Sequence, residues 1–391
     1  MMRSVYNMKK IIITFIIMML LLGCNNQNVF DLETFEQDRV IKIADEYLKA
    51  EPITITNFIA ERSTGGVHDY YSEGDYWWPN PEDPTGPYIR KDGLTNPDNF
   101  VAHRKAMRRF SIIVPALVAA YKITGDEKYA EQAVKHLNAW FVNPDSKMNP
   151  NLLYAQAISG KVAGRGIGII DTIHLVEVAQ AIIVLEKKRF LSFGDALPIK
   201  QWFEEYLKWL VTSDFGIEER DNGNNHSTCW VMQAGMYAKL VNNEAVLIEC
   251  REIYKHLILQ RQVEADGSFP LELKRTKPYG YSLFNLDAMV MVCAILTDGT
   301  NNMWQFATED GKNIKDAMEF MYPYIKDKSK WPYKKDVMYF DQWPVRQPSL
   351  LFAGFAFKES KYIELWKTLN PDPTEEEIIR NFPIRQPVLW I

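Results

Sequence analysis

Apolar residues recur at helical spacing along most of the chain after about residue 30. In the segment 34–50, TFEQDRVIKIADEYLKA, apolar side chains three and four positions apart share one face, as in an amphipathic helix. The same spacing predicts helices at 100–123, 127–142, 171–188, 199–212, 227–241, 244–262, 282–296 and 313–325. Because strand-like alternation is scarce, we expect an all-α protein.

The predicted helices have similar lengths and are joined mostly by short turns. Such helices form antiparallel arrays, which close into α/α toroids or stack as solenoids. No strict sequence repeat is present, which disfavours a regular solenoid. No linker or low-complexity tract interrupts the chain after residue 30, so we expect one domain over residues 24–391.

Two stretches break the helical pattern. The first, 65–100, is rich in Gly, Pro, Asp and aromatic residues, and the second, 265–282, is basic with two tyrosines. Loops this long inside a compact domain are often functional. Tyr76, Trp77 and Trp78 lie in the first loop, where exposed aromatic rings indicate a binding partner. Packing of the two tryptophans onto the helices is the alternative.

The N-terminus resembles an export signal. Lys9 and Lys10 precede the apolar run IIITFIIMMLLLG, which is too short for a confident membrane span. The sequence LLGC, ending at Cys24, resembles a bacterial lipobox. We therefore expect a signal peptide over residues 1–23 and lipidation of Cys24. The protein would be an exported lipoprotein on the periplasmic side of the outer membrane or on the cell surface, attached only by its lipid.

Composition narrows the class of ligand. The net charge of −5 argues against nucleic acid, but a basic cleft on an acidic protein can still bind an anion. Aromatic residues make up 13%, enough for a large core or for a cleft that matches the flat faces of sugars. The cysteines after residue 24 are odd in number and lie in apolar contexts, which indicates buried thiols: Cys229, Cys250 and Cys293.

The segment NGNNHSTCW, residues 222–230, combines a polar loop with the start of a helix. Asn225 is the expected N-cap and His226 lies in the first turn. A helix start offers free N–H groups and a positive dipole end, which favour a bound anion and a neutral imidazole. The alternative is that Asn225 only caps the helix while His226 faces solvent.

A second candidate segment is the basic loop before the helix at 282–296. Arg275 can bind a carboxylate through its planar fork, and Tyr281 follows six residues later. Lys274 and Tyr279 lie between or beside them. We expect nearby cations to ease loss of the tyrosine proton. Arg and Tyr in one loop are common, so a surface loop is the alternative.

Asn, His, Arg and Tyr together fit one reaction. β-Elimination from a uronic acid polymer removes the proton at C5, and the resulting charge spreads onto the neighbouring carboxylate. Asn, His and Arg can neutralise that carboxylate. Tyr can accept the C5 proton or donate one to the leaving oxygen at C4. This chemistry needs no metal and no cofactor, and no metal-binding spacing is present.

The motifs NNHS and DGSFPLELKR...YGYSLFNLDAM resemble the alginate lyase family of polysaccharide lyases. The Trp-rich stretch DYWWPNPEDPTGPYIRKDG and GRGIGIIDT resemble its bacterial lipoprotein branch, and the resemblance spans roughly residues 65–300. It implies an incomplete α/α toroid of antiparallel helices. It also implies four catalytic residues, namely Asn225, His226, Arg275 and Tyr281.

The resemblance leaves some roles open. Tyr279 is a rival for the tyrosine role, since the Arg-to-Tyr interval is one residue shorter than expected. Alginate or a glucuronan-like polymer is the expected anionic partner. Candidate substrate-binding residues are Tyr76, Trp77, Trp78, Arg90, Arg165, Lys274 and Tyr279.

Two other functions compete. A glycoside hydrolase on a similar toroid needs two carboxylates, for which Asp69, Asp75 and Glu272 are available. A glycan-binding lipoprotein without catalysis would use the Trp-rich loop alone.

Overall fold

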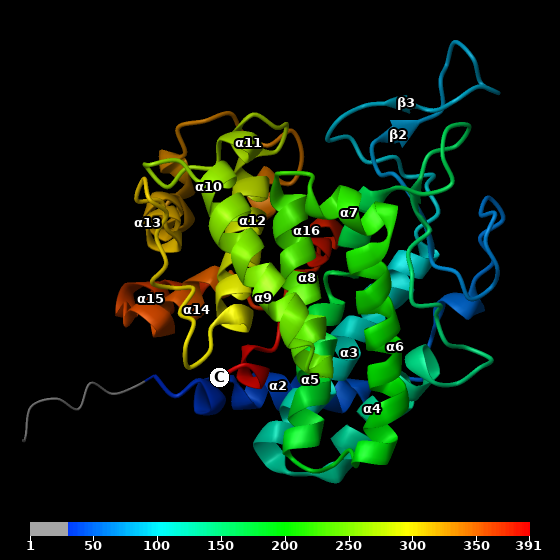
Figure 1. Cartoon of the computed structure of the whole chain (residues 1–391), viewed down its shortest axis with the longest axis horizontal. Coiled ribbons are helices and arrows are strands. Elements are labelled where there is room, and N and C mark those ends of the chain that lie inside the picture. Colours follow the sequence, from blue (N-terminus) through cyan, green and yellow to red (C-terminus); the bar gives the residue numbers. More distant parts are fainter. Residues whose placement is uncertain (1–29) are drawn as a thin grey trace, which may run out of the picture.

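The computed structural model describes residues 30–391, so the predicted signal peptide and Cys24 lie outside the described residues. Helices dominate this part of the chain (Figure 1). The longer ones are α2 (Leu32–Tyr47), α3 (Ala102–Thr124), α4 (Glu127–Phe141), α5 (Leu175–Lys187), α6 (Phe193–Thr212), α8 (Asn225–Val241), α9 (Glu244–Ile253), α12 (Pro278–Leu296), α13 (Ile314–Lys326), α14 (Pro348–Phe357) and α15 (Ser360–Thr368). The short ones are α7 (Asp214–Arg220), α10 (Leu259–Gln262), α11 (Pro270–Leu273) and α16 (Glu376–Arg380).

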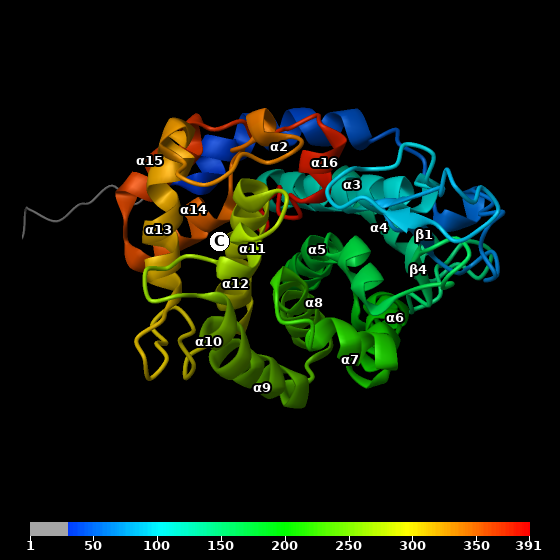
Figure 2. The same cartoon turned by 90° about the horizontal axis from the view of Figure 1, so that it is seen from above.

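The helices form an open arc around α5 and α8, which is the arrangement expected of an incomplete α/α toroid (Figure 2). α8 packs against α5, α6, α9 and α12, and α3 packs against α2, α4 and α5. The all-α class predicted from the helical spacing is confirmed.

The core lies between these helices and is strongly aromatic. Trp140, Phe203, Trp230 and Tyr237 are all fully buried within it. α12 is long and apolar enough to cross a membrane, but 89% of its most apolar window is buried inside the protein. Its apolar sequence therefore reflects its place in the core. Cys229, Cys250 and Cys293 are buried free thiols.

The stretch 65–100 is less irregular than its composition predicts, because it contains three short strands. β1 (Tyr71–Glu73) pairs in parallel with β4 (Tyr154–Ala157). β2 (Trp77–Trp78) pairs antiparallel with β3 (Ile89–Arg90), which places Trp77 opposite Arg90. The β2–β3 hairpin projects beyond the ends of the helices on one face of the arc (Figure 1).

Several helix boundaries depart from the predicted ones, and two of the departures lie next to the candidate chemistry. α12 begins at Pro278, so Tyr281 lies in its first turn instead of in the preceding loop. The predicted helix 171–188 begins as a 3₁₀ segment, η2 (Gly166–Thr172), before α5. α14, α15 and α16 were not predicted, because they are short, and the segment between α15 and α16 contains two prolines.

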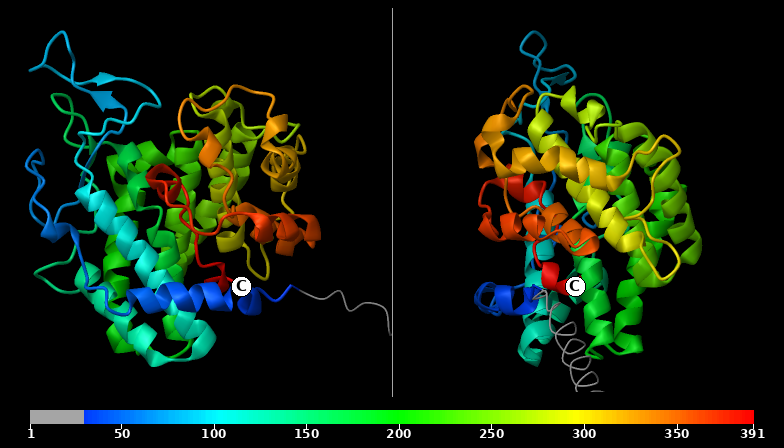
Figure 3. Two further views of the ribbon diagram at one scale, coloured as in Figure 1. Left: turned by 180° about the vertical axis from the view of Figure 1, so that it is seen from behind. Right: turned by 90° about the vertical axis from the view of Figure 1, so that its left-hand side faces the viewer.

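The arc of helices has two faces, one at each end of the helix axes. The starts of α8 and α12 lie on the face that carries α7, α11 and the β2–β3 hairpin (Figure 1). α2 and the C-terminus lie toward the opposite face (Figure 3).

Candidate active site

A cleft of about 340 Å³ lies between the starts of α8 and α12 and the β2–β3 hairpin. Asn225, His226, Arg275 and Tyr281 all line it. Of the candidate substrate-binding residues, Tyr76, Trp77, Arg90 and Arg165 line it too. The cleft therefore joins the start of α8, the loop before α12, the β2–β3 hairpin and the loop before η2.

The start of α8 differs from the prediction by one residue. Asn224, not Asn225, is the N-cap, and its side chain accepts a hydrogen bond of 3.0 Å from the His226 backbone N–H. Asn225 is the first helical residue and is buried. The expectation that Asn225 serves as the cap is therefore wrong, and its side chain is available for another contact.

That contact is Glu272 of α11. The backbone N–H of Asn225 donates to Oε1 of Glu272 at 3.0 Å, and the amide Nδ2 donates to Oε2 at 2.7 Å. Glu272 is only 1% exposed. Burial raises the pKa of Glu272, and the two hydrogen bonds from Asn225 oppose the rise. The paired contact holds the Asn225 amide in one orientation at the cleft wall.

His226 also contacts a buried carboxylate, that of Glu219. Its Nδ1 lies 2.7 Å from Oε1 of Glu219, a residue of α7 whose side chain is fully buried. Burial raises the pKa of Glu219, and the positive charge that His226 can carry lowers it. His226 is partly buried and lines the cleft, so it does not simply face solvent as the capping alternative requires.

Arg275 and Tyr281 lie against each other. The guanidinium carbon of Arg275 is 4.7 Å from the centre of the Tyr281 ring, within the range of a cation–π contact. Arg275 also lies 3.7 Å from Oδ1 of Asp92. The hydroxyl of Tyr281 shares a 2.7 Å hydrogen bond with the hydroxyl of Tyr76.

The protonation of Tyr281 differs from the sequence-based expectation. Burial raises the pKa of Tyr281 well above its usual value, Tyr76 raises it further, and Arg275 only partly opposes them. Arg275 eases loss of the Tyr281 proton, as expected, but desolvation of the phenolate outweighs its attraction, so the net shift of the pKa is upward. Tyr281 is a neutral phenol in the free protein.

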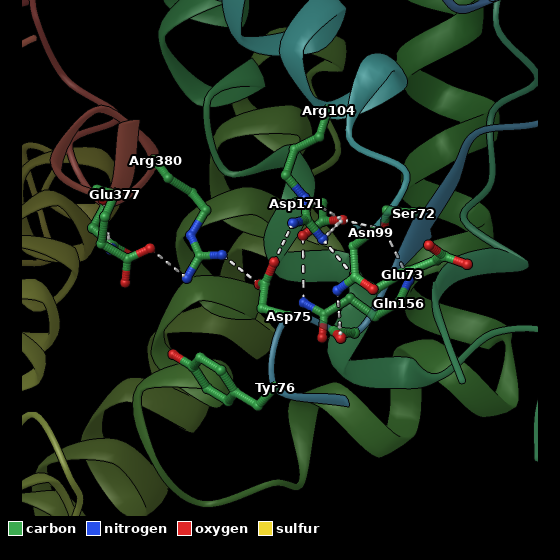
Figure 4. A network of polar contacts seen from close by, with 12 residues as sticks. Ser72, Glu73, Asp75, Tyr76, Asn99, Arg104, Gln156, Asp171, Glu377 and Arg380 are labelled. Carbon is green, nitrogen blue, oxygen red and sulfur yellow. Dashed lines mark hydrogen bonds and ion pairs between the residues drawn. The ribbon is translucent and has the colours of Figure 1, made fainter. Parts of the chain in front are cut away.

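A buried ionic network forms the wall behind Tyr76 (Figure 4). Asp75 pairs with Arg104 at 2.6 Å and with Arg380 of α16. Arg380 also pairs with Glu377 at 3.0 Å. Burial raises the pKa of Asp75, but Arg104 and Arg380 lower it more, so the net shift is downward. The network ties the loop before β2 to the C-terminal part of the chain.

Arg165 is held at the cleft by Gln156 of β4. Its Nε donates to the Gln156 carbonyl at 2.8 Å, and Gln156 adopts a left-handed φ of 49°. The glycines of GRGIG, residues 164–168, lie against other parts of the protein. A Cβ on Gly166 would lie 2.7 Å from the Phe215 carbonyl oxygen of α7. Gly166 is thus required for close packing between η2 and α7.

Three candidate substrate-binding residues do not line the cleft. Trp78 donates its Nε1–H to the Leu94 carbonyl and does not line the cleft. Lys274 is exposed and does not line it either. Tyr279 is fully buried and donates its hydroxyl to the Tyr324 carbonyl at 3.0 Å. The structure gives access to Tyr281 and not to its rival Tyr279.

The three carboxylates considered for hydrolysis are committed to other partners. Asp69 accepts hydrogen bonds from Asn149 and from the Gly66 backbone. Asp75 is held between two arginines, and Glu272 holds Asn225. None of them is a free acid, so the geometry disfavours a glycoside hydrolase.

Sequence reasoning missed several residues that shape the cleft. Asp171 and Asn381 line it, Arg380 reaches it from α16, and Glu219 supports His226 from behind. Glu219 sits in GIEERDNG, where its neighbours are charged and no pattern distinguishes it from a solvated side chain. Among residues 30–391, no group of three or more His, Cys, Asp or Glu side chains could hold a metal ion.

Comparisons with known proteins agree on one family. A family model described as alginate lyase matches residues 54–331. An alginate lyase from Bacteroides ovatus is similar in structure, with 32% identity, a TM-score of 0.78, and coverage of 92% of this chain and 93% of that chain. No curated protein matches.

More distant structures share the fold. Alginate lyase A1-III from Sphingomonas species A1 has 15% identity and a TM-score of 0.55, with coverage of 90% of this chain and 94% of that chain. A histidine-to-alanine variant of A1-III in complex with a tetrasaccharide has 15% identity, a TM-score of 0.59 and the same coverage.

Proposed function

This chain belongs to the alginate lyase family and is a polysaccharide lyase, and we propose that it cleaves alginate or a glucuronan-like uronate polymer by β-elimination. The observation that carries the proposal is the convergence of Asn225, His226, Arg275 and Tyr281 on one cleft. The chain covers nearly the whole of the Bacteroides ovatus alginate lyase, so the likeness is not confined to part of the domain.

The first task in this chemistry is to neutralise the carboxylate next to C5. Arg275 offers a planar fork that matches a carboxylate, and its stacking on Tyr281 places it beside the proton carrier. Asn225 and His226 lie on the same cleft. Groups aimed at charge that grows in the transition state accelerate the reaction more than groups that bind only the ground state.

The second task is to move two protons. The C5–H bond breaks, a C4–C5 double bond forms, and the C4–O bond breaks with a proton going to the leaving oxygen. Tyr281 is neutral in the free protein, because burial raises its pKa, so it can donate that proton. The C5 proton can go to Nε2 of His226, or to the Tyr281 oxygen as its own proton passes to the leaving oxygen.

The test is incubation with alginate and glucuronan while ultraviolet absorbance of the new C4–C5 double bond is followed. We expect absorbance to rise with one or both polymers, and His226→Ala to lose most of the rate while its circular dichroism is unchanged. New reducing ends without absorbance would identify a hydrolase. Binding without either product would identify a glycan-binding protein.

Export as a lipoprotein, on the periplasmic side of the outer membrane or on the cell surface, is part of the same proposal. Its support is the lipobox-like LLGC at Cys24. The start of α2 lies toward the end of the molecule away from the β2–β3 hairpin, so a tether there would leave the cleft open to a long polymer (Figure 3). Incorporation of labelled palmitate into the wild type but not into Cys24→Ser would support the anchor, and equal labelling would refute it.

A further inference from the structure

Within the described part of the chain, the buried carboxylate of Glu219 has one hydrogen-bond partner, His226. The distance from Glu219 Oε1 to His226 Nδ1 is 2.7 Å, and the Glu219 side chain is fully buried while that of His226 is 17% exposed. The other oxygen, Oε2, is buried without a hydrogen-bond partner among residues 30–391. A buried carboxylate costs free energy unless it is well paired, so Glu219 is a poor choice for stability alone.

The short helix α7 is built to hold Glu219 in place. A Cβ on Gly216 would lie 1.9 Å from the Leu210 carbonyl oxygen, so α7 packs directly against the end of α6. On its other side, α7 packs against Gly166 of η2. Ser213 caps α7 by accepting from the Gly216 N–H at 3.0 Å. Glu219 therefore projects from a backbone fixed on two sides.

We propose that Glu219 is a positioning residue, which holds Nδ1 of His226, turns Nε2 toward the cleft and strengthens the attraction of the imidazole for a proton. The proposal rests on the lyase function proposed above. With a neutral ring, Nδ1–H donates to Glu219 and Nε2 is left with a lone pair that can accept a proton. With a protonated ring, Nε2–H can donate to a substrate carboxylate while Glu219 balances the charge.

Other charges also act on His226, so the effect of Glu219 must be separated from theirs. Groups on the neighbouring elements are Glu218 on α7, Asp171 in η2, Glu272 on α11, Arg275 after α11, Tyr281 on α12 and Arg165 across the cleft. Of these and Glu219, only Glu219 is hydrogen bonded to the imidazole ring. A change confined to Glu219 therefore tests the direct contact.

The experiment compares the wild type with Glu219→Gln, which keeps the size of the side chain and removes its charge. By analogy with the residues that orient metal-bound histidines, we expect kcat to fall about 10–100-fold, with a smaller change in KM. The limb of the pH–rate profile that reports His226 should move to lower pH, because an imidazolium without the carboxylate loses its proton more easily. An ascending limb would mark His226 as a base, and a descending limb would mark it as a cation.

Asp287→Asn is the matched control. Asp287 is another buried carboxylate, 2% exposed, which accepts from the Ser349 N–H and does not line the cleft. We expect its kcat and its pH limbs to match those of the wild type at pH values where it is folded. The proposal would be overturned if Glu219→Gln folds and has the same kcat and the same pH profile as the wild type.

Two further measurements keep the inference separate from the proposed function. In His226→Ala, the added change Glu219→Gln should cost no further activity, whereas a purely structural role would add its own loss. NMR of the His226 ring needs no substrate, and the ¹⁵N shifts of the neutral ring should show a larger share of the Nδ1–H tautomer in the wild type than in Glu219→Gln. An equal share would overturn the inference even if the lyase function holds. If Glu219→Gln fails to fold, Glu219→Asp should give a smaller change in the same direction.

Discussion

The hydroxyl of Tyr281 lies 2.7 Å from the hydroxyl of Tyr76, although 205 residues separate them along the chain. The contact joins the first turn of α12 to the loop before β2. Tyr281 thus has a polar partner at the cleft in addition to Arg275 on its ring face. The two tyrosines can share or pass a proton, which makes their separate contributions measurable.

Tyr281→Phe should abolish most turnover while substrate binding is nearly unchanged, because only one oxygen is lost. A general acid–base group contributes typically about 10²–10⁴-fold. Tyr279→Phe is the matched control, since it loses only the buried bond to the Tyr324 carbonyl, worth about 1 kcal/mol of stability. Initial rates of double-bond formation on saturating polymer decide the matter. If Tyr281→Phe stays active, the tyrosine mechanism must be dropped.

Tyr76→Phe should be milder than Tyr281→Phe and should change the pH dependence. Tyr76 raises the pKa of Tyr281, second only to burial, so the pKa of Tyr281 should fall when the Tyr76 hydroxyl is removed. Because Tyr281 acts as a proton donor, the high-pH limb of the rate profile should move to lower pH. A limb that stays in place would show that Tyr76 does not influence the proton carrier.

Arg275→Lys should lower turnover substantially although it keeps the positive charge. An ammonium group lacks the planar fork that pairs with a carboxylate, and it stacks less well on the Tyr281 ring. Loss of one donor to a developing anion typically costs about 10²–10³-fold in kcat. Steady-state kinetics would reveal a change in KM alone if Arg275 served only to bind the ground state.

Trp77→Ala should weaken binding of long polymers more than of short oligosaccharides, and Trp78→Ala should do so less. Trp77 lines the cleft with Lys161 4.5 Å from its ring centre, whereas Trp78 lies outside the lining. By analogy with bases stacked on aromatic side chains, one ring is worth about 1–3 kcal/mol. KM values for long and short substrates provide the comparison. Equal effects of the two changes would assign both rings to packing.

Asp287→Asn should become more stable than the wild type above neutral pH. Burial raises the pKa of Asp287 to about 7, and hydrogen bonding to Ser349 only partly opposes it. A raised folded-state pKa gives stability that is complete below the unfolded pKa and is lost as pH rises through about 7. The difference should reach the order of 4 kcal/mol at high pH. The free energies of unfolding of both proteins would be measured in urea at pH 5 and pH 8. An equal difference between the two proteins at both pH values would contradict the prediction.

Local patterns predicted the framework well. The spacing of apolar residues located α2, α3, α4, α8 and α13 to within a few residues, because helix formation depends on side chains three and four positions apart. The single helix predicted at 244–262 covers both α9 and α10. α14, α15 and α16 were missed, since they are short and their stability depends on packing. The sequence correctly indicated that the stretch 65–100 is not helical. Its strands could not be predicted, because each is only two or three residues long and pairs with a distant or short partner.

The candidate site shows the same division. The polar helix start at 224–226 and the basic loop at 274–281 were visible, because both depend on neighbouring residues. The cap was misplaced by one residue, since Asn224 and Asn225 are equally good caps and only the contact with Glu272 separates them. The proton affinity of Tyr281 was misjudged, because desolvation depends on burial that a sequence does not display.

The sequence by itself determined the helical class, the two segments that carry the candidate chemistry, and the family to which the chain belongs. Only the tertiary structure decided that Tyr281 and not Tyr279 reaches the cleft. The same holds for the hydrogen bond between Glu219 and His226, and for the ion pair between Arg380 and Asp75, which are 305 residues apart. The reason is physical. Helical periodicity is set within a few residues, whereas burial and the pairing of distant charges arise only when the arc of helices is packed.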